Sequence, residues 1–381
     1  MAAVSKIALL GFGTVGSAVA RRLAAAPLGS HVNPVLTHIF DRRAEQKRAA
    51  WSGAPVVWTS AIDDVLRSDV DIVVEAIGGI DPAADHIRRA LEAGKSVVTA
   101  NKQVVAREGH ALWSLAARQG RQFRFEAAVG GAVPIVRAIA DGLAGDRLIR
   151  IDAVLNGTTN GILSQMDATG CALTDALAAA QANGWAEADP SQDLDGDDAR
   201  AKLAILCALA FGLRVEPEQI AAKSCAAIDA ADVAAARRSN GAIRQIAHGE
   251  YDHVRRELTA WVAPIVVERG SIFGRTTGPQ NAAIITGVHS GEVGIFGTGA
   301  GGDATAVAIV SDVVAIARDR AAIVPPPALT SDFTIRPSNL ETATSDFRLV
   351  TSDFRLVTSD FRLPTSDFRL PTSDFQCAEA V

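Results

Sequence analysis

The stretch Gly11-Phe12-Gly13-Thr14-Val15-Gly16 decides the fold of this 381-residue chain. It follows the apolar run from Ile7 to Leu10 and opens a helical pattern, so it connects a strand to a helix. Glycines at this spacing allow a tight turn, a close approach of the backbone to a pyrophosphate, and a phosphate on the helix N-terminus. We therefore interpret Gly11, Gly13, Thr14, Val15 and Gly16 as a dinucleotide-binding loop.

Short apolar runs continue after this loop and alternate with helical patterns. They cover residues 35–40, 72–77, 96–100 and 123–127. Continuous apolar runs bounded by Gly and Asp are typical of parallel strands buried on both faces. We predict an α/β fold with a Rossmann-type, doubly wound parallel sheet in a domain of residues 1–135. The apolar helix expected at 304–317 could return to this domain, so residues 302–320 are assigned to it.

The chain changes character between these two parts. Strand-like pieces at 258–267 and 282–288 lie among helical patterns, which predicts a mixed α+β domain over residues 136–301.

The end of the chain is repetitive. Thr-Ser-Asp-Phe recurs at 330, 344, 351, 358, 365 and 372. Phe and Leu only two residues apart cannot form a coiled-coil seam, and each copy has too little apolar surface for a core. We expect residues 328–381 to form a disordered, dispensable tail, with an ordered use of the repeats as the alternative.

Composition excludes several classes of protein. A net charge of −6 without a basic stripe argues against nucleic acid as a partner. Cysteines at 171, 207, 225 and 377 have no paired spacing and are expected to be reduced thiols. The apolar run near the start is too short for a signal peptide or a membrane helix, so we expect a cytoplasmic protein.

Residues 184–202 crowd six carboxylates into a segment that then becomes an apolar helix. A calcium loop is excluded, because Ser191 and Lys202 stand where an EF-hand needs acids. Asp198 and Lys202 are four residues apart at a helix start and share one face, while Leu203 and Leu206 belong to the opposite, buried stripe. A lysine beside several acids suits a site that holds an amino acid and moves a proton.

Ligands of doubly wound sheets lie at the carboxyl ends of the strands, where Gly78 and Lys102 follow the fourth and fifth strands. Lys102 is therefore expected near the nicotinamide; a solvated lysine at a helix start is the alternative. Asp41 ends the second strand, where an acid binds the ribose 2′-hydroxyl and favours NAD. Arg42 and Arg43 follow and could pair with the 2′-phosphate of NADP, so the cofactor subtype stays open.

Two further glycine-containing motifs leave alternatives. Residues 156–161, Asn-Gly-Thr-Thr-Asn-Gly, are either a helix cap or a substrate loop. Residues 297–302 are either a flexible linker or a loop that approaches a ligand with bare backbone.

Taken together, these motifs resemble homoserine dehydrogenases. The matching pieces are GFGTVG at 11–16, TANK at 99–102, EAAVGGAVP at 126–134, NGTTN at 156–160, GWAEADPSQDLDGDDARAK at 184–202 and GTGAGGDAT at 297–305. They cover roughly residues 5–318 in the family's order. Trp185 stands where the family has Phe or Tyr.

The resemblance implies an NAD(P)-dependent enzyme that interconverts aspartate 4-semialdehyde and L-homoserine in threonine, methionine and isoleucine biosynthesis. It implies Lys202 as general acid/base, Lys102 as a second lysine, and Asp198 near the reacting hydroxyl. Glu187 would take the substrate's α-ammonium, with Asp193, Thr158 and Asn156 as further substrate ligands. The implied cofactor site comprises Gly11, Gly13, Thr14, Val15, Gly16, Asp41, Arg42, Gly78, Lys102 and Gly301.

The resemblance also implies a structural sodium ion held by Glu126 and the carbonyls of Val129, Gly131 and Val133. It implies that the mixed domain binds substrate and forms a homodimer. The repeats occupy the place of the family's regulatory domain, so we expect no threonine-sensing unit. Two rivals remain: another NAD(P)-dependent amino-acid oxidoreductase, and a catalytically silent NAD-binding interaction protein. Lys102, Glu187, Asp198 and Lys202 together argue against silence.

Overall fold

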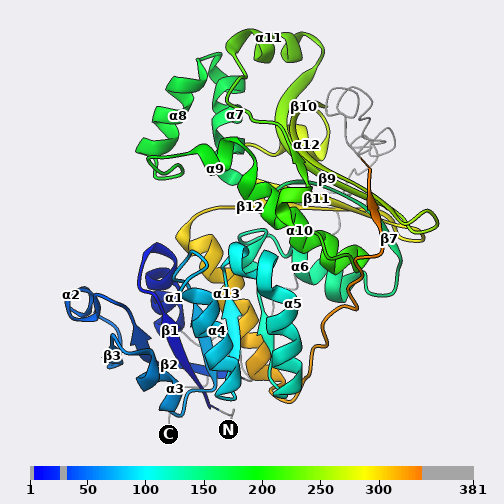
Figure 1. The fold of residues 1–381 in the computed structure, drawn as a ribbon. Helices are drawn as coiled ribbons and strands as arrows, with labels where there is room; N and C mark the ends of the chain where they lie inside the picture. The colour runs from blue at the N-terminus through cyan, green and yellow to red at the C-terminus, as the bar shows by residue number, and fades with distance from the viewer. Residues whose placement is uncertain (1–3, 26–31, 337–381) are drawn as a thin grey trace, which may run out of the picture. The chain divides into compact units, whose positions relative to one another are not determined.

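A computed structural model describes residues 4–25 and 32–336 (Figure 1). Its first sheet has six parallel strands in the order β3-β2-β1-β4-β5-β6. The strands are β1 Val4–Leu10, β2 Asn33–Phe40, β3 Val57–Thr59, β4 Ile72–Glu75, β5 Ser96–Thr99 and β6 Phe123–Arg124. The order runs outward in both directions from β1 and β4, so the predicted doubly wound sheet is confirmed.

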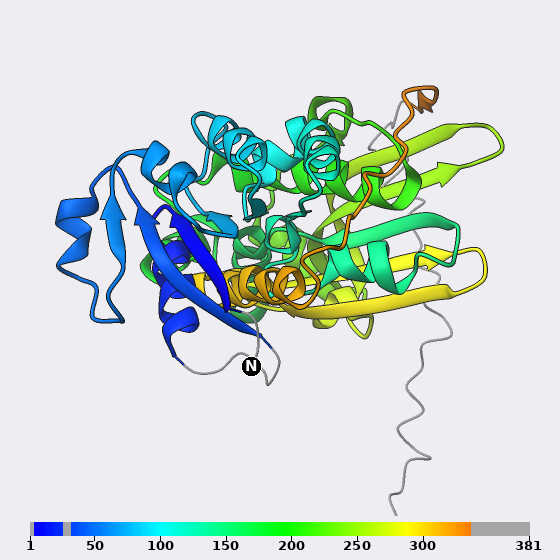
Figure 2. The ribbon, with the colours of Figure 1, turned by 90° about the horizontal axis from the view of Figure 1, so that it is seen from below.

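Helices cover both faces of this sheet. They are α1 Thr14–Ala24, α2 Ala44–Arg48, α3 Ile62–Arg67, α4 Ala83–Glu92, α5 Lys102–Arg118 and α13 Gly302–Arg318. Ile7 and Leu9 of β1 pack in one apolar cluster with α1 and α13, while Ala8 and Leu10 pack in another with α4 and α5. This alternation follows from the two-residue period of a strand. The last helix, which we expected could return to the first domain, packs with α1 on one face of this sheet (Figure 2).

The second sheet is mixed and has the order β12-β11-β7-β9-β10-β13, with β8 also on β10. Its strands are β7 Leu148–Val154, β8 Ala221–Ala222, β9 Gly241–Asp252, β10 Glu257–Glu268, β11 Gln280–Gly287, β12 Gly291–Thr298 and β13 Thr334–Ile335. The β7, β9, β10, β11 and β12 pairings are antiparallel, whereas β8 and β13 run parallel to β10. The predicted mixed character of this region is confirmed.

Helices accompany the second sheet, and α7 and α10 both contact β9. They are α6 Ile135–Arg137, α7 Gly157–Thr169, α8 Leu173–Ala182, α9 Ser191–Leu194, α10 Asp197–Phe211, α11 Ala230–Arg238 and α12 Ile272–Arg275. Leu203 and Leu206 of α10 are fully buried, as the predicted apolar stripe requires. The domain limits at 135 and 301 stay predictions.

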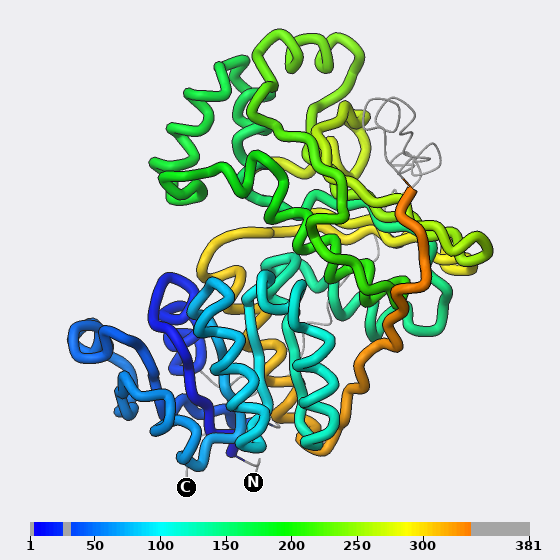
Figure 3. Tube along the Cα trace, in the orientation of Figure 1, coloured from blue at the N-terminus to red at the C-terminus, as the bar shows by residue number. Residues whose placement is uncertain are grey.

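The chain beyond α13 runs past α5 and α10 and ends as β13 on the edge of the second sheet (Figure 3). We call residues 321–336 the C-terminal strap. It contains the first repeat copy, Thr330 to Phe333, so residues 328–336 of the tail that we expected to be disordered are instead placed against the rest of the chain. The five later copies lie outside the described residues.

Within residues 4–25 and 32–336, no helix combines the length and the apolar composition needed to cross a bilayer. The three cysteines of this part, Cys171, Cys207 and Cys225, are free thiols. Burial raises the pKa of Cys207 and of Cys225 to about 12, so both thiols stay protonated at neutral pH.

Candidate active site

The glycine loop brings β1 and α1 so close together that side chains would not fit. Gly11 has φ +93°, and a Cβ there would lie 2.7 Å from the Ala76 carbonyl oxygen. A Cβ at Gly16 would lie 2.0 Å from the Gly11 carbonyl oxygen. These approaches are the ones for which the fingerprint needs glycine. The N-terminus of α1 therefore lies open at the carboxyl end of β1, as a dinucleotide site requires.

Asp41 lies beside this loop and is buried. Its carboxylate accepts hydrogen bonds from the Phe12 and Arg43 amides, both 2.9 Å long, and from Lys47 Nζ at 2.5 Å. Burial opposes ionisation of Asp41, but these bonds outweigh it and hold its pKa below the usual value. Arg42 is exposed. Lys47, which the sequence interpretation missed, adds a cation to a hollow that Phe12, Thr14 and Trp51 also line.

Gly78 lies in the loop after β4 and Lys102 is the first residue of α5, and two buried polar residues fix the loops that lead to them. The Glu75 carboxylate accepts hydrogen bonds from the amides of Ile77 (2.7 Å) and Gly78 (3.3 Å) and from the Thr99 hydroxyl. Burial raises the pKa of Glu75.

Asn101 connects these two loops. Its amide nitrogen donates to the Gly79 carbonyl at 2.6 Å, and its amide oxygen caps α5 by accepting the Val104 amide at 3.2 Å. An asparagine three residues before Val104 was a readable cap signal for the start of α5 at Lys102. Asn101 therefore fixes the position from which Lys102 extends.

Lys102, Asp198 and Lys202 meet, and we call them the lysine centre. Asp198 lies in the first turn of α10 with 3% of its surface exposed. Lys202 Nζ is 2.8 Å from Asp198 Oδ2 and donates to the Leu155 carbonyl at 2.7 Å. Lys102 Nζ pairs with the other oxygen, Oδ1. The shared face of Asp198 and Lys202 is as predicted, and α5 brings the second lysine to the same carboxylate.

The two lysines respond differently to this carboxylate. Burial lowers the pKa of Lys202, and the nearby charge of Lys102 lowers it further, so that the attraction of Asp198 does not restore it. Lys102 is about a third exposed, and the attraction of Asp198 outweighs the effect of burial and raises its pKa. The pKa of Asp198 is driven well below its usual range, because both ammonium groups oppose the cost of burying it. Lys202 is therefore the lysine that more readily loses a proton.

Asn156 is a helix cap, one of the two roles that the sequence left open for its motif. Its amide oxygen caps α7 by accepting the Thr159 amide at 2.7 Å. Its amide nitrogen donates to Asp193 at 2.7 Å and to Asp198 at 2.9 Å. Burial raises the pKa of Asp193. Asn156 is thus a helix cap and a part of the acidic cluster at once.

The remaining expected substrate residues surround this cluster. Thr158 is buried and donates its hydroxyl proton to the Trp185 carbonyl at 2.8 Å. Glu187 is exposed, and its charge contributes, after those of Asp198 and Asp193, to the raised pKa of Lys102. Trp185 is 40% exposed and lies against α7, since a Cβ at Gly161 would lie 3.3 Å from its ring.

The loop before α13 contacts both the glycine loop and the start of α7. A Cβ at Gly302 would lie 3.1 Å from the Thr14 carbonyl oxygen, and one at Gly157 would lie 2.9 Å from the Ala300 Cβ. Gly301 has φ +109°, a backbone conformation that glycine adopts without strain. Residues 297–302 therefore lie close to both motifs; whether they approach a ligand with bare backbone stays a prediction.

Glu126, Asp312 and Arg137 form a second buried cluster, which we call the carboxylate pair. The Glu126 carboxylate accepts the amides of Val136 and Arg137, both at 2.9 Å, and the Glu126 amide donates to Asp312 at 2.9 Å. Arg137 donates to Asp312 at 2.6 Å. Burial, followed by the charge of Asp312, raises the pKa of Glu126 to about 7, and burial also raises that of Asp312.

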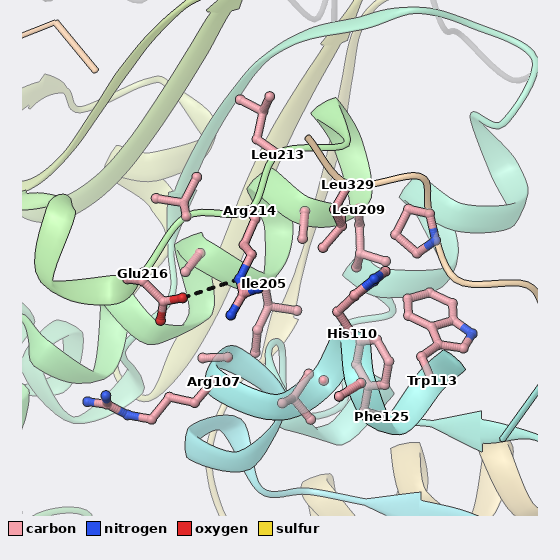
Figure 4. Close-up of a pocket in the computed structure, with 18 residues that line it drawn as sticks. Arg107, His110, Trp113, Phe125, Ile205, Leu209, Leu213, Arg214, Glu216 and Leu329 are labelled. Atoms are coloured by element: carbon pink, nitrogen blue, oxygen red, sulfur yellow. Dashed lines mark ion pairs between the residues drawn. The ribbon is translucent and has the colours of Figure 1, made fainter. Parts of the chain in front are cut away.

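A separate cavity of about 110 Å³ lies between α5, α10 and the C-terminal strap (Figure 4). Trp113, Phe125, Leu209, Leu213 and Leu329 are among the residues that line it. The lysine centre lies outside it. Its lining is largely apolar and its walls include the strap, so it bears on how the strap is held.

Two family models match the chain: homoserine dehydrogenase over residues 134–314, and the NAD binding domain of homoserine dehydrogenase over residues 11–126. The homoserine dehydrogenase of Synechocystis sp. is 39% identical over 318 residues, which cover 82% of this chain and 73% of that protein. That of Mycobacterium tuberculosis is 39% identical over 323 residues, covering 82% and 72%.

Solved structures agree with these matches. A homoserine dehydrogenase from Thiobacillus denitrificans superposes with a TM-score of 0.79 at 32% identity, covering 88% of this chain and 80% of that one. A hyperthermophilic archaeal homoserine dehydrogenase in complex with NADPH gives 0.70 at 28% identity, covering 85% and 100%.

Proposed function

Because the chain belongs to the homoserine dehydrogenase family, and is therefore an NAD(P)-dependent oxidoreductase, we propose that the lysine centre is where aspartate 4-semialdehyde and L-homoserine interconvert. One observation carries this proposal: two lysines contact opposite oxygens of one buried aspartate, and their pKa values shift in opposite directions. A bound nicotinamide would accept or supply the hydride.

Lys202 is the proton-transfer group in this proposal. In homoserine oxidation, neutral Lys202 takes the proton from the hydroxyl oxygen while a hydride leaves the carbon that bears this hydroxyl. In the reverse direction, the Lys202 ammonium returns the proton to the alkoxide. The lowered pKa of Lys202 favours the neutral form that oxidation needs. Lys102, whose pKa is raised, stays an ammonium and stabilises the negative oxygen. Asp198 orients both lysines.

The acids around this centre would bind the substrate's amino group. The charge of Glu187 acts on Lys102, and Asp193 lies against Asn156, so both carboxylates lie near the lysine centre. The positive charge of the substrate's α-ammonium group would neutralise part of the negative charge of these two carboxylates. Initial rates with homoserine, with NAD and with NADP, test the activity directly; another amino alcohol turning over faster than homoserine would favour the rival oxidoreductase.

We propose that NAD or NADP binds along the glycine loop, with the adenosine end in the hollow beside Lys47 and Trp51. Asp41 supports NAD, but its carboxylate already holds Lys47. Arg42, Arg43 and Lys47 would attract a 2′-phosphate. The ratio of kcat/KM for the two cofactors measures which group dominates.

We also propose the structural sodium ion. Glu126, with the carbonyls of Val129, Gly131 and Val133, offers the oxygen donors that a hard monovalent cation prefers. The Glu126 and Val133 carbonyls each also accept one backbone amide, from Val129 at 3.4 Å and from Ile135 at 2.8 Å. Gly131 has φ +63°, which turns the chain sharply within this set. A higher melting temperature in sodium than in choline chloride of equal ionic strength would support the ion; equal values would contradict it.

We propose a homodimer formed through the second sheet and a cytoplasmic location. β12 is an edge strand of that sheet, and its Phe296 is 60% exposed. An exposed strand edge with apolar side chains is a common pairing surface. The free thiols of the described residues suit a reducing compartment. Sedimentation of wild type and Phe296→Asp tests the dimer: only the variant should become monomeric.

A further inference from the structure

The first repeat copy is seated on a definite part of the molecule. The backbone of Thr330 bonds to both sides of the α10 exit: its amide donates to Gly212 O at 2.9 Å, and its carbonyl accepts the Arg214 amide at 3.0 Å. Further on, the Thr334 amide donates to Arg256 O at 3.0 Å, and the Arg336 amide to Leu258 O at 2.9 Å. We call Gly212–Arg214 and Arg256–Leu258 the receiving edge.

Side chains add to this backbone pairing at alternate positions. Phe333 and Ile335 pack, partly buried, against the main apolar core. Leu329 lies beside Leu209 and Leu213 at the separate cavity (Figure 4). Phe333 and Ile335 are two residues apart on either side of Thr334 of β13, so both side chains share the face toward the core.

Polar residues of the copy also have partners. Asp332 pairs with Arg256, and the Asp332 amide donates to the Thr330 hydroxyl at 3.0 Å, closing a small turn. Of the four residues, Thr330 is thus held through its backbone, Asp332 through its side chain, and Phe333 through its packing against the core. Ser331, the fourth, is exposed.

The later copies keep most of the features that the receiving edge contacts; they lack the ion pair of Arg336 with Glu257 (2.8 Å), because none of them has a charged residue at that position. Thr, Ser, Asp and Phe are identical in all of them, and the residue before Thr is always apolar: Leu329 in the first copy, then Ala343, Val350, Val357, Pro364 and Pro371. The position two after Phe is Ile335 in the first copy and Leu in the next four. From these matches we propose that the repeats are interchangeable ligands of the receiving edge. When the first copy is displaced, the copy at Thr344 or Thr351 of the same chain takes its place.

The residue three after Phe predicts how strongly each copy binds the receiving edge. In the first copy it is Arg336, whose amide donates a hydrogen bond to the Leu258 carbonyl. The second and third copies have Val350 and Val357 there, which keep an amide proton. The fourth and fifth copies have proline at this position, which has none. They should bind more weakly. Moving from the first to the second copy loops out only 14 residues, and the entropy of loop closure grows slowly with length.

Hydrogen exchange in the full chain tests the exchange of copies. Asp332→Ala with Phe333→Ala disables the first copy; a matched variant adds Ala at Phe347, Phe354, Phe361, Phe368 and Phe375. We expect the Arg214 amide to lose less than about tenfold protection in the first variant, and at least tenfold more in the second. Equal loss in both variants would overturn the proposal. Protection that rises with protein concentration would overturn its assignment to the same chain. Turnover on homoserine checks that both variants fold.

A peptide measurement gives an independent answer. The chain itself supplies a matched pair: residues 350–357, VTSDFRLV, and residues 357–364, VTSDFRLP, which differ only in the last residue. Labelled peptides are titrated into the variant with all copies disabled. We expect saturable binding of VTSDFRLV, at least threefold weaker binding of VTSDFRLP, and none of VTSDFRLV carrying Phe354→Ala. Absent binding of VTSDFRLV, or equal binding of all three, would contradict the proposal.

Discussion

The lysine centre and the carboxylate pair solve the same physical problem with opposite charge balance. In the first, one buried carboxylate, Asp198, meets two ammonium groups; in the second, two buried carboxylates, Glu126 and Asp312, share the guanidinium of Arg137. Burial opposes ionisation in both, yet the pKa of Asp198 falls and that of Glu126 rises to about 7. The ratio of opposite charges, and not burial alone, decides which way a buried acid shifts.

This difference matches what each cluster is proposed to bind. A centre with surplus positive charge suits a substrate oxygen that becomes negative during the reaction. A cluster with surplus negative charge is where an additional cation would be stabilised, which is the reason to look for sodium there. Four substitutions and two truncations, with their controls, can break or sharpen the comparison.

The largest expected effect comes from Lys202→Ala. It removes the proton-transfer group and should lower kcat for homoserine oxidation by about 10² to 10⁴-fold, with cofactor binding retained. Rapid-quench or steady-state rates together with cofactor titration measure both. Lys202→Arg is the control, since it keeps the charge but cannot lose a proton near neutral pH, and it should be nearly as inactive. A Lys202→Ala enzyme with more than half the wild-type rate would refute the assigned role.

Arg137→Met and Lys102→Met should differ in their effect on stability. Arg137→Met leaves two buried carboxylates without their cation and should cost about 3 to 5 kcal/mol of unfolding free energy. Lys102→Met leaves Asp198 paired with Lys202 and should cost about 1 kcal/mol or less. Urea unfolding of both variants measures this. Similar losses would mean that the charge ratio is not what distinguishes the clusters.

The same pair of variants has a pH dependence with a definite sign. The pKa of Glu126 is raised in the folded state, so its contribution to stability is full below its unfolded pKa and is lost as pH rises through about 7. The loss of unfolding free energy that Arg137→Met causes, relative to wild type, should therefore grow between pH 5.5 and 8.5. The deficit of Lys102→Met should change little over that range, because the pKa of Asp198 is already far below it. A deficit of Arg137→Met that shrinks at high pH would contradict this.

Lys47→Ala extends the comparison to a cluster with one positive and one negative group, Lys47 and Asp41. Removing Lys47 leaves Asp41 unneutralised where the 2′-substituent of the cofactor is expected, so NADP should lose more than NAD. We expect the NAD/NADP ratio of kcat/KM to rise about tenfold, or about 1.4 kcal/mol. Glu45→Ala, on the same helix, is the control and should leave the ratio unchanged. A ratio that falls would show that the 2′-phosphate lies elsewhere.

The smallest effect is expected from cutting the chain after Arg336, which touches neither cluster and should change the melting temperature by about 1 °C or less. A cut after Val324 also removes Leu329, Phe333 and Ile335 from the core and should lower it measurably. Calorimetry of both truncated proteins makes the comparison. Equal melting temperatures would mean that the C-terminal strap does not stabilise the fold, as we first expected for the whole tail.

Features written in nearby residues were predictable. The glycine loop, the strands beside it and the Asp198–Lys202 pair all depend on local order: a strand, a turn, or four residues of one helix. The strand β9 was missed because Arg244, Gln245 and His248 are polar although each is buried. Arg244 is satisfied by the carbonyls of Ile243, Gly274 and Thr276, partners that appear only once the chain has folded.

Long-range charge pairs were less predictable for the same reason. Spacing alone could not bring Lys102 to Asp198 or reveal that Arg137 is shared with Asp312, and the Asp41–Lys47 pair lacks a helical period. The resemblance supplied the two lysines together, but not their arrangement on one carboxylate. The first repeat copy was misjudged because its composition gave no sign of a waiting strand edge.

The contact between Lys102 and Asp198 also makes catalytic activity more sensitive to heating than the secondary structure is. Lys102 is the first residue of α5, which packs on the parallel sheet. Asp198 lies in the first turn of α10, which packs on the mixed sheet. A small loosening between these two helices would separate Lys102 from Asp198 while the strands of both sheets stay paired. Since local openings cost less than global unfolding, we expect heat inactivation to precede the loss of secondary structure, and to reverse on cooling.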